Sequence, residues 1–165
     1  MEKLQITLNI NGKDHELMVL PHDTLLETLR DELDLTGSKE SCGEGICGSC
    51  TIQMDGKPVR SCLTLAMEAQ GTKIKTVEGL AMGDDLSDLQ QSFIDHGAVQ
   101  CGFCTSGMLM SADALLNETS DPDRTTIQKA LSGNICRCTG YSKIVEAVAH
   151  SGRPEKSCPD CQTKE

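Results

Sequence analysis

The sequence predicts an α+β fold in which an N-terminal β-grasp domain is followed by a C-terminal four-helix bundle. Apolar and polar residues alternate at the start of the chain, an Asn11-Gly12 turn follows them, and from Leu86 onward the apolar spacing becomes helical. We expect the β-grasp domain to span residues 1–78 and the helical domain residues 79–150, with a polar tail over residues 151–165.

Two hairpins and one helix define the first predicted domain. Apolar residues recur at every second position on both sides of Asn11-Gly12, a pair typical of two-residue hairpin turns. Thr24 and Glu27 form a capping-box pattern at the start of a helix that ends before Gly37. The remaining predicted strands are 51–54, 59–62 and 73–77. Plant-type ferredoxins are built on this β-grasp architecture.

Four helices are predicted in the second domain, because apolar residues there recur at intervals of three and four. Asp121-Pro122-Asp123 separates the second helix from the third, and residues 78–85 read as the linker between the domains. The apolar positions expected to share helix faces are Leu86, Leu89, Phe93 and Ile94; Met108, Leu109, Ala112, Leu115 and Leu116; Ile127 and Leu131; and Ile144, Val145 and Val148.

Size, charge and hydropathy exclude several classes of protein. A chain of 165 residues is short for a complete active-site architecture, which favours a component of a larger assembly. The net charge of -10, without a block of Lys and Arg, argues against nucleic-acid binding. Residues 1–10 alternate instead of forming an export signal, and no run of about 18 apolar residues predicts a membrane span. We therefore expect a cytoplasmic protein that does not bind membranes.

Ten cysteines in a chain without an export signal favour metal binding over a disulfide framework. Cys42, Cys47, Cys50 and Cys62 have the C-x4-C-x2-C spacing and distant fourth cysteine that are typical of plant-type 2Fe-2S ligands. The glycines of this segment allow the backbone to wrap tightly and its amides to face sulfur. A structural zinc site and a set of redox-sensing thiols are the alternatives.

A second set consists of Cys101, Cys104, Cys136 and Cys138, which flank predicted helices. Antiparallel helices can bring such segments together, and helix N-termini near Cys104 and Tyr141 would stabilise a negatively charged cluster. Spacing alone leaves both an iron-sulfur cluster and zinc open for this set.

Three motifs together carry a resemblance to a known family. C-G-E-G-I-C-G-S-C at residues 42–50, Q-C-G-F-C-T at 100–105 and G-N-I-C-R-C-T-G-Y at 133–141 resemble the iron-sulfur subunit of the xanthine oxidase family of molybdenum hydroxylases. The resemblance runs from about Leu4 to Ala149. It implies that the second cysteine set also binds a 2Fe-2S cluster. One departure is Ser106, at a position where the family often has proline.

The resemblance also implies a function and partners. The chain would pass electrons from a molybdenum-pterin centre in a large subunit, through the helical-domain cluster and then the ferredoxin-like cluster, to FAD in a medium subunit. Gln100 matches the family glutamine that hydrogen-bonds the pterin cofactor; a solvated side chain is the alternative reading. The chain itself would hold neither a catalytic residue nor a substrate site, and the whole enzyme is expected to be a dimer of heterotrimers.

Three further predictions concern the substrate, the tail and the competing functions. Residues 60–71 resemble subunits of enzymes that hydroxylate aromatic N-heterocycles, which favours such a substrate or a purine. Cys158 and Cys161 form another C-x2-C pair near His150, but we expect a flexible tail there. The alternatives for the whole chain are a freestanding two-cluster ferredoxin and a zinc-stabilised interaction module.

Overall fold

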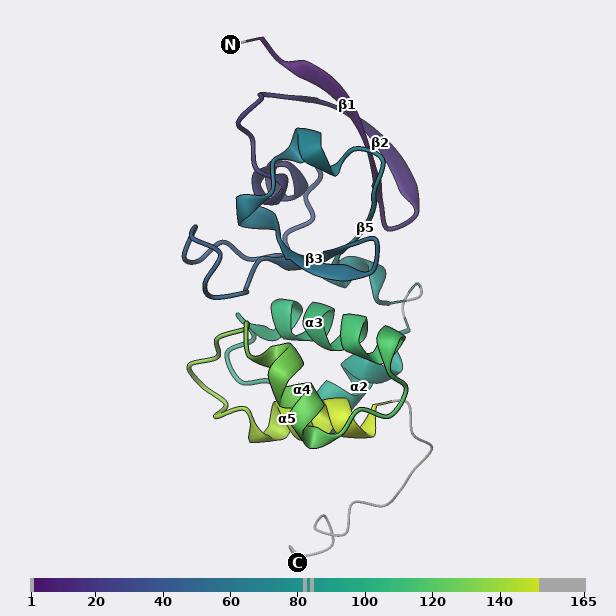
Figure 1. Cartoon of the computed structure of the whole chain (residues 1–165), viewed down its shortest axis with the longest axis vertical. Coiled ribbons are helices and arrows are strands. Elements are labelled where there is room, and N and C mark those ends of the chain that lie inside the picture. The colour runs from purple at the N-terminus through teal and green to yellow at the C-terminus, as the bar shows by residue number, and fades with distance from the viewer. Residues whose placement is uncertain (1, 82, 84, 152–165) are drawn as a thin grey trace, which may run out of the picture.

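The structure is a computed structural model that describes residues 2–81, 83 and 85–151. A mixed β-sheet with short helices forms the N-terminal half, and longer helices form the C-terminal half (Figure 1). The two halves stack along the long axis of the molecule, with α3 (Thr105–Glu118) lying across the end of the sheet at β3 (Thr51–Met54). A ferredoxin-like domain followed by a helical domain is confirmed.

Five strands make one sheet in the order β2-β1-β5-β3-β4. The other strands are β1 (Leu4–Ile10), β2 (Lys13–Val19), β4 (Lys57–Arg60) and β5 (Lys73–Lys75). β1 pairs antiparallel with β2 across the predicted turn, which Asn11 and Gly12 form with positive φ angles of 51° and 80°. β5 lies between the two hairpins, parallel to β1 and antiparallel to β3, and so makes the sheet mixed.

Local differences separate the sequence prediction from the observed N-terminal half. The predicted capping box is present, but α1 (Leu25–Glu27) continues as a π-helical segment, η1 (Thr28–Glu32), and Asp34 has a φ of 55°. Leu25 and Leu26 of α1 and Leu29 of η1 are all buried. Residues 61 and 62 leave the predicted strand for a 3₁₀ turn. The 3₁₀ segments are η2 (Ser61–Leu63), η3 (Ala66–Ala69) and η4 (Val77–Gly79).

The C-terminal half contains α2 (Asp88–Asp95), α3, α4 (Arg124–Leu131) and α5 (Ser142–His150). With α1 the described residues contain five α-helices, and α2 to α5 are the four that follow the sheet. Leu89 and Phe93 of α2 are buried as predicted. The predictions for Leu86 and Ile94 were wrong. Leu86 lies ahead of the N-cap Ser87 and is 46% exposed, and Ile94 is 58% exposed because the eight-residue α2 buries only one narrow stripe.

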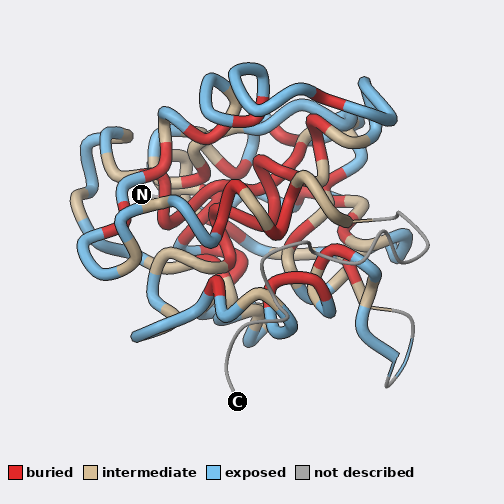
Figure 2. The backbone as a smooth tube through the Cα atoms, turned by 90° about the horizontal axis from the view of Figure 1, so that it is seen from below, coloured by how far each residue is buried: buried red, intermediate tan, exposed pale blue. Residues whose placement is uncertain are grey.

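Each half has its own apolar core, and buried backbone occupies the interior in Figure 2 while exposed loops run round it. The sheet core includes Leu8, Ile10, Leu25, Leu29, Ile52 and Ile74. The helical core includes Phe93, Met108, Met110, Ile127, Leu131 and Ile144, and Leu80 of the connecting segment also packs in it. Leu80 therefore anchors the connection between the halves to the helical core.

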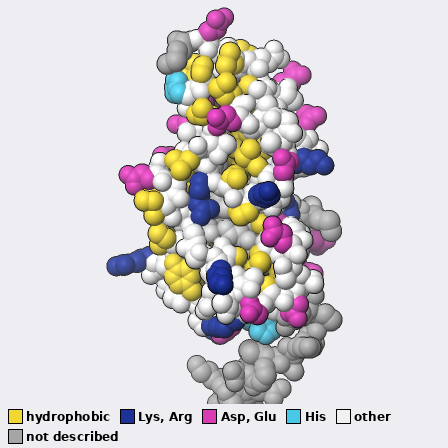
Figure 3. All heavy atoms as spheres, in the orientation of Figure 1, with side chains coloured by type: hydrophobic (Ala, Val, Ile, Leu, Met, Phe, Trp, Pro, Cys, Tyr) yellow, Lys and Arg dark blue, Asp and Glu magenta, His cyan; other side chains and the backbone are white. Residues whose placement is uncertain are grey.

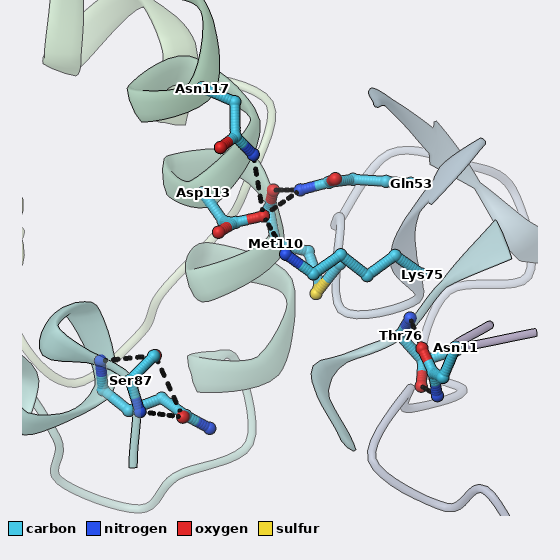
Figure 4. A network of polar contacts seen from close by, with 9 residues as sticks. Asn11, Gln53, Lys75, Thr76, Ser87, Met110, Asp113 and Asn117 are labelled. Carbon is cyan, nitrogen blue, oxygen red and sulfur yellow. Dashed lines mark hydrogen bonds and ion pairs between the residues drawn. The ribbon is translucent and has the colours of Figure 1, made fainter. Parts of the chain in front are cut away.

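Polar contacts join the halves along α3 (Figure 4). Buried Gln53 of β3 donates hydrogen bonds to the Met110 carbonyl (2.9 Å) and to Asp113 Oδ2 (2.8 Å). Lys75 Nζ of β5 lies 2.9 Å from the same Asp113 oxygen, which also accepts a bond from Asn117. We call these contacts of Asp113 the distal network, because none of its members belongs to a cysteine-bearing loop.

Candidate metal centres

The first cysteine set lies at one end of the sheet. Cys42, Cys47 and Cys50 are on the loop between η1 and β3, and Cys62 follows β4 in the 3₁₀ turn η2. Gly43 and Gly45 have φ angles of 65° and 73°, so the predicted tight wrapping of this loop is confirmed. The structure therefore brings all four predicted residues of this set to one place.

These four sulfurs are grouped in two pairs. The Sγ atoms of Cys50 and Cys62 lie 3.3 Å apart, and the thiols of Cys42 and Cys47 hydrogen-bond each other. The backbone amides of Glu44 and Cys47 each donate to Cys42 Sγ at 3.4 Å. Amide donors aimed at sulfur stabilise negative charge there, as the sequence predicted for this loop.

The pKa values of two thiols in this set differ widely, so the two ligands differ in how readily they lose a proton. The amides of Cys47 and then Glu44 lower the pKa of the Cys42 thiol to about 6, so it is mainly a thiolate at neutral pH. Burial, followed by the neighbouring Cys50 thiol, raises the pKa of Cys62 to about 11. Burial and Cys50 thus disfavour the thiolate form of Cys62. A metal cation bound to this sulfur would stabilise that form, because metal ligation deprotonates a thiol outright.

The second set lies at the N-terminal end of α3. Cys104 caps the N-terminus of α3, Cys101 precedes it, and Cys136 and Cys138 lie on the loop before α5. Cys101 and Cys138 Sγ are 3.5 Å apart, and the Cys104 and Cys136 thiols hydrogen-bond each other. The helix N-termini predicted beside Cys104 and Tyr141 are both present.

Burial and donors oppose one another within this set. Burial, and then the Cys136 thiol, raise the pKa of Cys104 to about 12. Burial acts the same way on Cys136, but hydrogen bonds from the Thr139 hydroxyl (3.0 Å) and amide (3.4 Å) outweigh it and lower that pKa. The adjacent Cys101 thiol raises the pKa of Cys138. Thr139 thus supplies the stabilisation of sulfur charge that this set needs.

Sequence reasoning missed the part that two side chains play in the second set. One is Thr139, and the other is Tyr141, whose hydroxyl accepts a hydrogen bond from the Cys136 amide at 2.8 Å. Tyr141 has a φ of 70°, a left-handed conformation that costs energy for a residue with a side chain. Their place directly after the C-R-C motif is the signal that could have found them.

The remaining predicted residues are placed as follows. Gln100 is exposed and directly precedes Cys101, at the rim of the second set. Cys158 and Cys161 lie outside the described residues. In residues 2–81, 83 and 85–151, no three His, Cys, Asp or Glu side chains are arranged around a single ion.

The donor sets fit two 2Fe-2S clusters. Each set offers four soft sulfur ligands divided into two close pairs, and a cluster with two irons needs one pair for each iron. The amide and hydroxyl donors on Cys42 and Cys136 match the negative charge that such a cluster carries.

Two family models match the chain. A "2Fe-2S iron-sulfur cluster binding domain" matches residues 8–81, and a "[2Fe-2S] binding domain" matches residues 76–149. Together they cover both cysteine sets and the strands and helices from β2 to α5, except the last residue of α5. The two cysteine sets thus fall in separate matched regions.

Similar proteins match this chain over nearly their whole length. The nicotine 6-hydroxylase small subunit of Paenarthrobacter nicotinovorans is 50% identical over 147 residues, 89% of this chain and 88% of the relative. The nicotinate dehydrogenase small FeS subunit of Eubacterium barkeri is 47% identical, over 92% and 96%. The crystal structure of quinoline 2-oxidoreductase from Pseudomonas putida 86 contains a chain with a TM-score of 0.88 and 49% identity, with 90% and 92% covered.

Proposed function

The chain belongs to the iron-sulfur subunits of the xanthine oxidase family of molybdenum hydroxylases, and we propose that its eight described cysteines hold two 2Fe-2S clusters. Cys42, Cys47, Cys50 and Cys62 are the proposed ligands of the first cluster. Cys101, Cys104, Cys136 and Cys138 are the proposed ligands of the second. The pairing of sulfurs within each set is the observation that carries this assignment.

The protein is an electron-transfer subunit of an oxidoreductase complex. When bound, its clusters supply one-electron redox chemistry. This role needs no substrate site on the chain. The chain's own residues do the rest: amides at Cys42 and the Thr139 hydroxyl at Cys136 donate to sulfur, and Cys62 and Cys104 are half-buried. Such donors and burial are the means by which a protein sets cluster potentials.

We assign the domain boundary to residue 78 and treat α2 to α5 as a four-helix bundle. The two family models overlap at residues 76–81, which include η4. α2 packs on α3 and α5, and α4 also packs on α3 and α5, so the four helices close around one core. The predicted polar tail, residues 151–165, lies outside the described residues beyond Ser151.

The expected partners are a large molybdenum-pterin subunit and a medium FAD subunit. Large apolar side chains are exposed beside both cysteine sets, Ile46 (62%) and Leu63 (61%) near the first and Phe103 (45%) and Ile135 (51%) near the second. Exposed apolar side chains of this size mark interaction surfaces when they cluster. Lys and Arg lie singly among acidic groups on the face in Figure 3, in keeping with a protein partner instead of nucleic acid.

The proposed order places the Cys101 cluster nearest to molybdenum and the Cys47 cluster nearest to FAD, in a dimer of heterotrimers in the cytoplasm.

Copurification tests the assembly: the hydroxylase subunit emerges with a large and a medium chain, whereas a freestanding ferredoxin emerges alone. The described residues contain no helix long and apolar enough to span a membrane.

An aromatic N-heterocycle or a purine is the proposed substrate class. The relatives named above are a nicotine hydroxylase and a nicotinate dehydrogenase, and the solved neighbour is a quinoline oxidoreductase. All three names refer to aromatic nitrogen heterocycles, in agreement with the resemblance of residues 60–71. Turnover assays of the assembled enzyme with such a heterocycle and with an aldehyde test this class.

Iron analysis is the direct test of the cluster assignment. We expect about four iron and four acid-labile sulfides per chain, because each 2Fe-2S cluster contributes two of each. The protein should be brown, with weak aromatic absorption beside the cluster bands, since it contains one Tyr and no Trp. Zinc in place of iron, in a folded and fully metallated sample, would refute the assignment and favour the interaction module.

The role of Gln100 is tested by Gln100→Ala in the assembled enzyme. Loss of a hydrogen bond to the pterin cofactor should cost about 1 to 3 kcal/mol, which slows reduction of the clusters by substrate by about fivefold to 150-fold. Gln91→Ala is the matched control, because Gln91 is also exposed and bonds only Asp95 of its own helix. Equal rates in both variants would mean that Gln100 is a solvated side chain.

A further inference from the structure

Asn134 is a buried amide between the two cysteine-bearing loops. It is 2% exposed and lies two residues before Cys136, at the entry to the loop of the second set. A buried amide must find hydrogen-bond partners, because an unsatisfied one costs free energy. The partners that Asn134 uses come from the other half of the molecule as well as its own.

The side chain of Asn134 joins three segments. Its Nδ2 donates to the carbonyl oxygen of Gly48 (3.0 Å) and to Thr51 Oγ1 (3.2 Å). Its Oδ1 accepts from the Ser111 hydroxyl (2.8 Å) on α3. One amide thus links the first cysteine loop, the start of β3 and the middle of α3, with both its donor and acceptor ends engaged.

The residues on either side of Asn134 make contacts of the same kind. The Ile135 amide donates to the carbonyl of Cys47 at 2.8 Å, and the Gly133 carbonyl accepts from Arg60 Nη2 at 2.6 Å. Residues 133–135 are therefore each hydrogen-bonded to the N-terminal half. Two of these bonds end on Cys47 itself or on Gly48, the residue that follows it. We call these contacts the proximal joint.

Glycines also let backbone approach backbone closely at the proximal joint. A Cβ atom added at Gly107 of α3 would lie 2.2 Å from the Gly48 carbonyl oxygen, and one added at Gly48 would lie 2.5 Å from the Gly133 carbonyl oxygen. Both positions are tighter than any real contact, so backbone packs directly on backbone here. A shift of the Asn134 loop would therefore move the second cysteine set relative to the first.

We propose that Asn134 is the positioning residue that fixes the separation and orientation of the two clusters. This inference rests on the proposed function, because it needs both cysteine sets loaded. The distal network joins the same two halves through Gln53, Lys75 and Asp113 but touches neither cysteine loop (Figure 4). The distal network holds the halves together, and the proximal joint sets the distance across which the clusters interact.

Electron paramagnetic resonance of the fully reduced holoenzyme at low temperature tests the proposal. Each reduced cluster carries an unpaired electron, and the magnetic interaction of two nearby spins splits their signals by an amount that falls steeply with separation. Asn134→Ala should diminish or abolish this splitting while iron content and both individual signals persist. Ser111→Ala, which frees only the Oδ1 end, should change the splitting in the same direction to a smaller extent.

Asp113→Asn is the matched control, because it removes the ion pair with Lys75 and leaves the proximal joint intact. It should lower the thermal stability and leave the splitting unchanged. An unchanged splitting in both Asn134→Ala and Ser111→Ala would overturn the inference. If Asn134→Ala does not fold, Ser111→Ala alone decides the matter. Absence of iron from the unmodified protein would instead refute the proposed function, so the failure of the inference and the failure of the proposed function are distinguishable.

Discussion

In the assembled enzyme, a Cys47→Ser variant given substrate should reduce the cluster of the helical half but not the flavin. The serine hydroxyl is a much poorer iron ligand than a thiolate, so the first set loses its cluster and iron falls by half, to about two per chain. The second cluster should survive, because the Cys47 carbonyl that accepts the Ile135 amide is retained in the variant. Rapid-reaction spectra that follow the clusters and the flavin separately measure this outcome.

The double variant Cys158→Ala, Cys161→Ala is the matched control for the loss of cysteine. Those residues lie outside both proposed ligand sets, so iron content and flavin reduction should be unchanged. Normal flavin reduction in the Cys47→Ser enzyme would show that the proposed order of the clusters is wrong. Loss of both clusters in a folded Cys47→Ser protein would show that the two sets do not load independently.

A Cys101→Ser variant should interrupt the sequence one step earlier. Cys101 is paired with Cys138 at 3.5 Å, and removing one member of the pair leaves one iron with an incomplete set of ligands. Substrate should then reduce the molybdenum centre alone, and the remaining cluster and the flavin should both stay oxidised. Turnover with an electron acceptor should fall to the background rate of enzyme without substrate.

The comparison between the two variants is the sharper measurement, because both lose one cluster and half the iron. They differ in which carriers become reduced, and this difference reports the order of the clusters. If the Cys101→Ser enzyme reduced its remaining cluster at the normal rate, electrons would enter at the first set. The second cysteine set would then not be the one nearest to molybdenum.

The cysteine loops could be predicted well because their chemistry is local. Gly43, Gly45 and Gly48 all have positive φ, as the spacing of the first set demanded, and the amides next to Cys42 donate to its sulfur. The helix N-termini at Cys104 and Tyr141 were predicted from apolar spacing alone. Short-range constraints of this kind are expressed in a few adjacent residues, where sequence patterns are most informative.

Residues that act across the two halves could not be found in this way. Asn134 sits 86 residues from its partner Gly48, and Gln53 sits 60 residues from Asp113, so no local pattern links them. The exposure of Ile94 has a related cause, because α3 and α5 are the main neighbours of α2 and an apolar pattern does not say how many neighbours a helix has. Tertiary packing decided each of these positions.

The place of β5 in the sheet has a consequence for how the chain emerges from the ribosome. β5 is the last strand to be synthesised, yet it lies in the centre of the sheet, between β1 and β3. Until residues 73–75 leave the exit tunnel, the nascent chain has two separate hairpins, and an isolated hairpin is at best marginally stable in water. Vectorial synthesis therefore delays closure of the sheet until shortly before the helical half begins to appear.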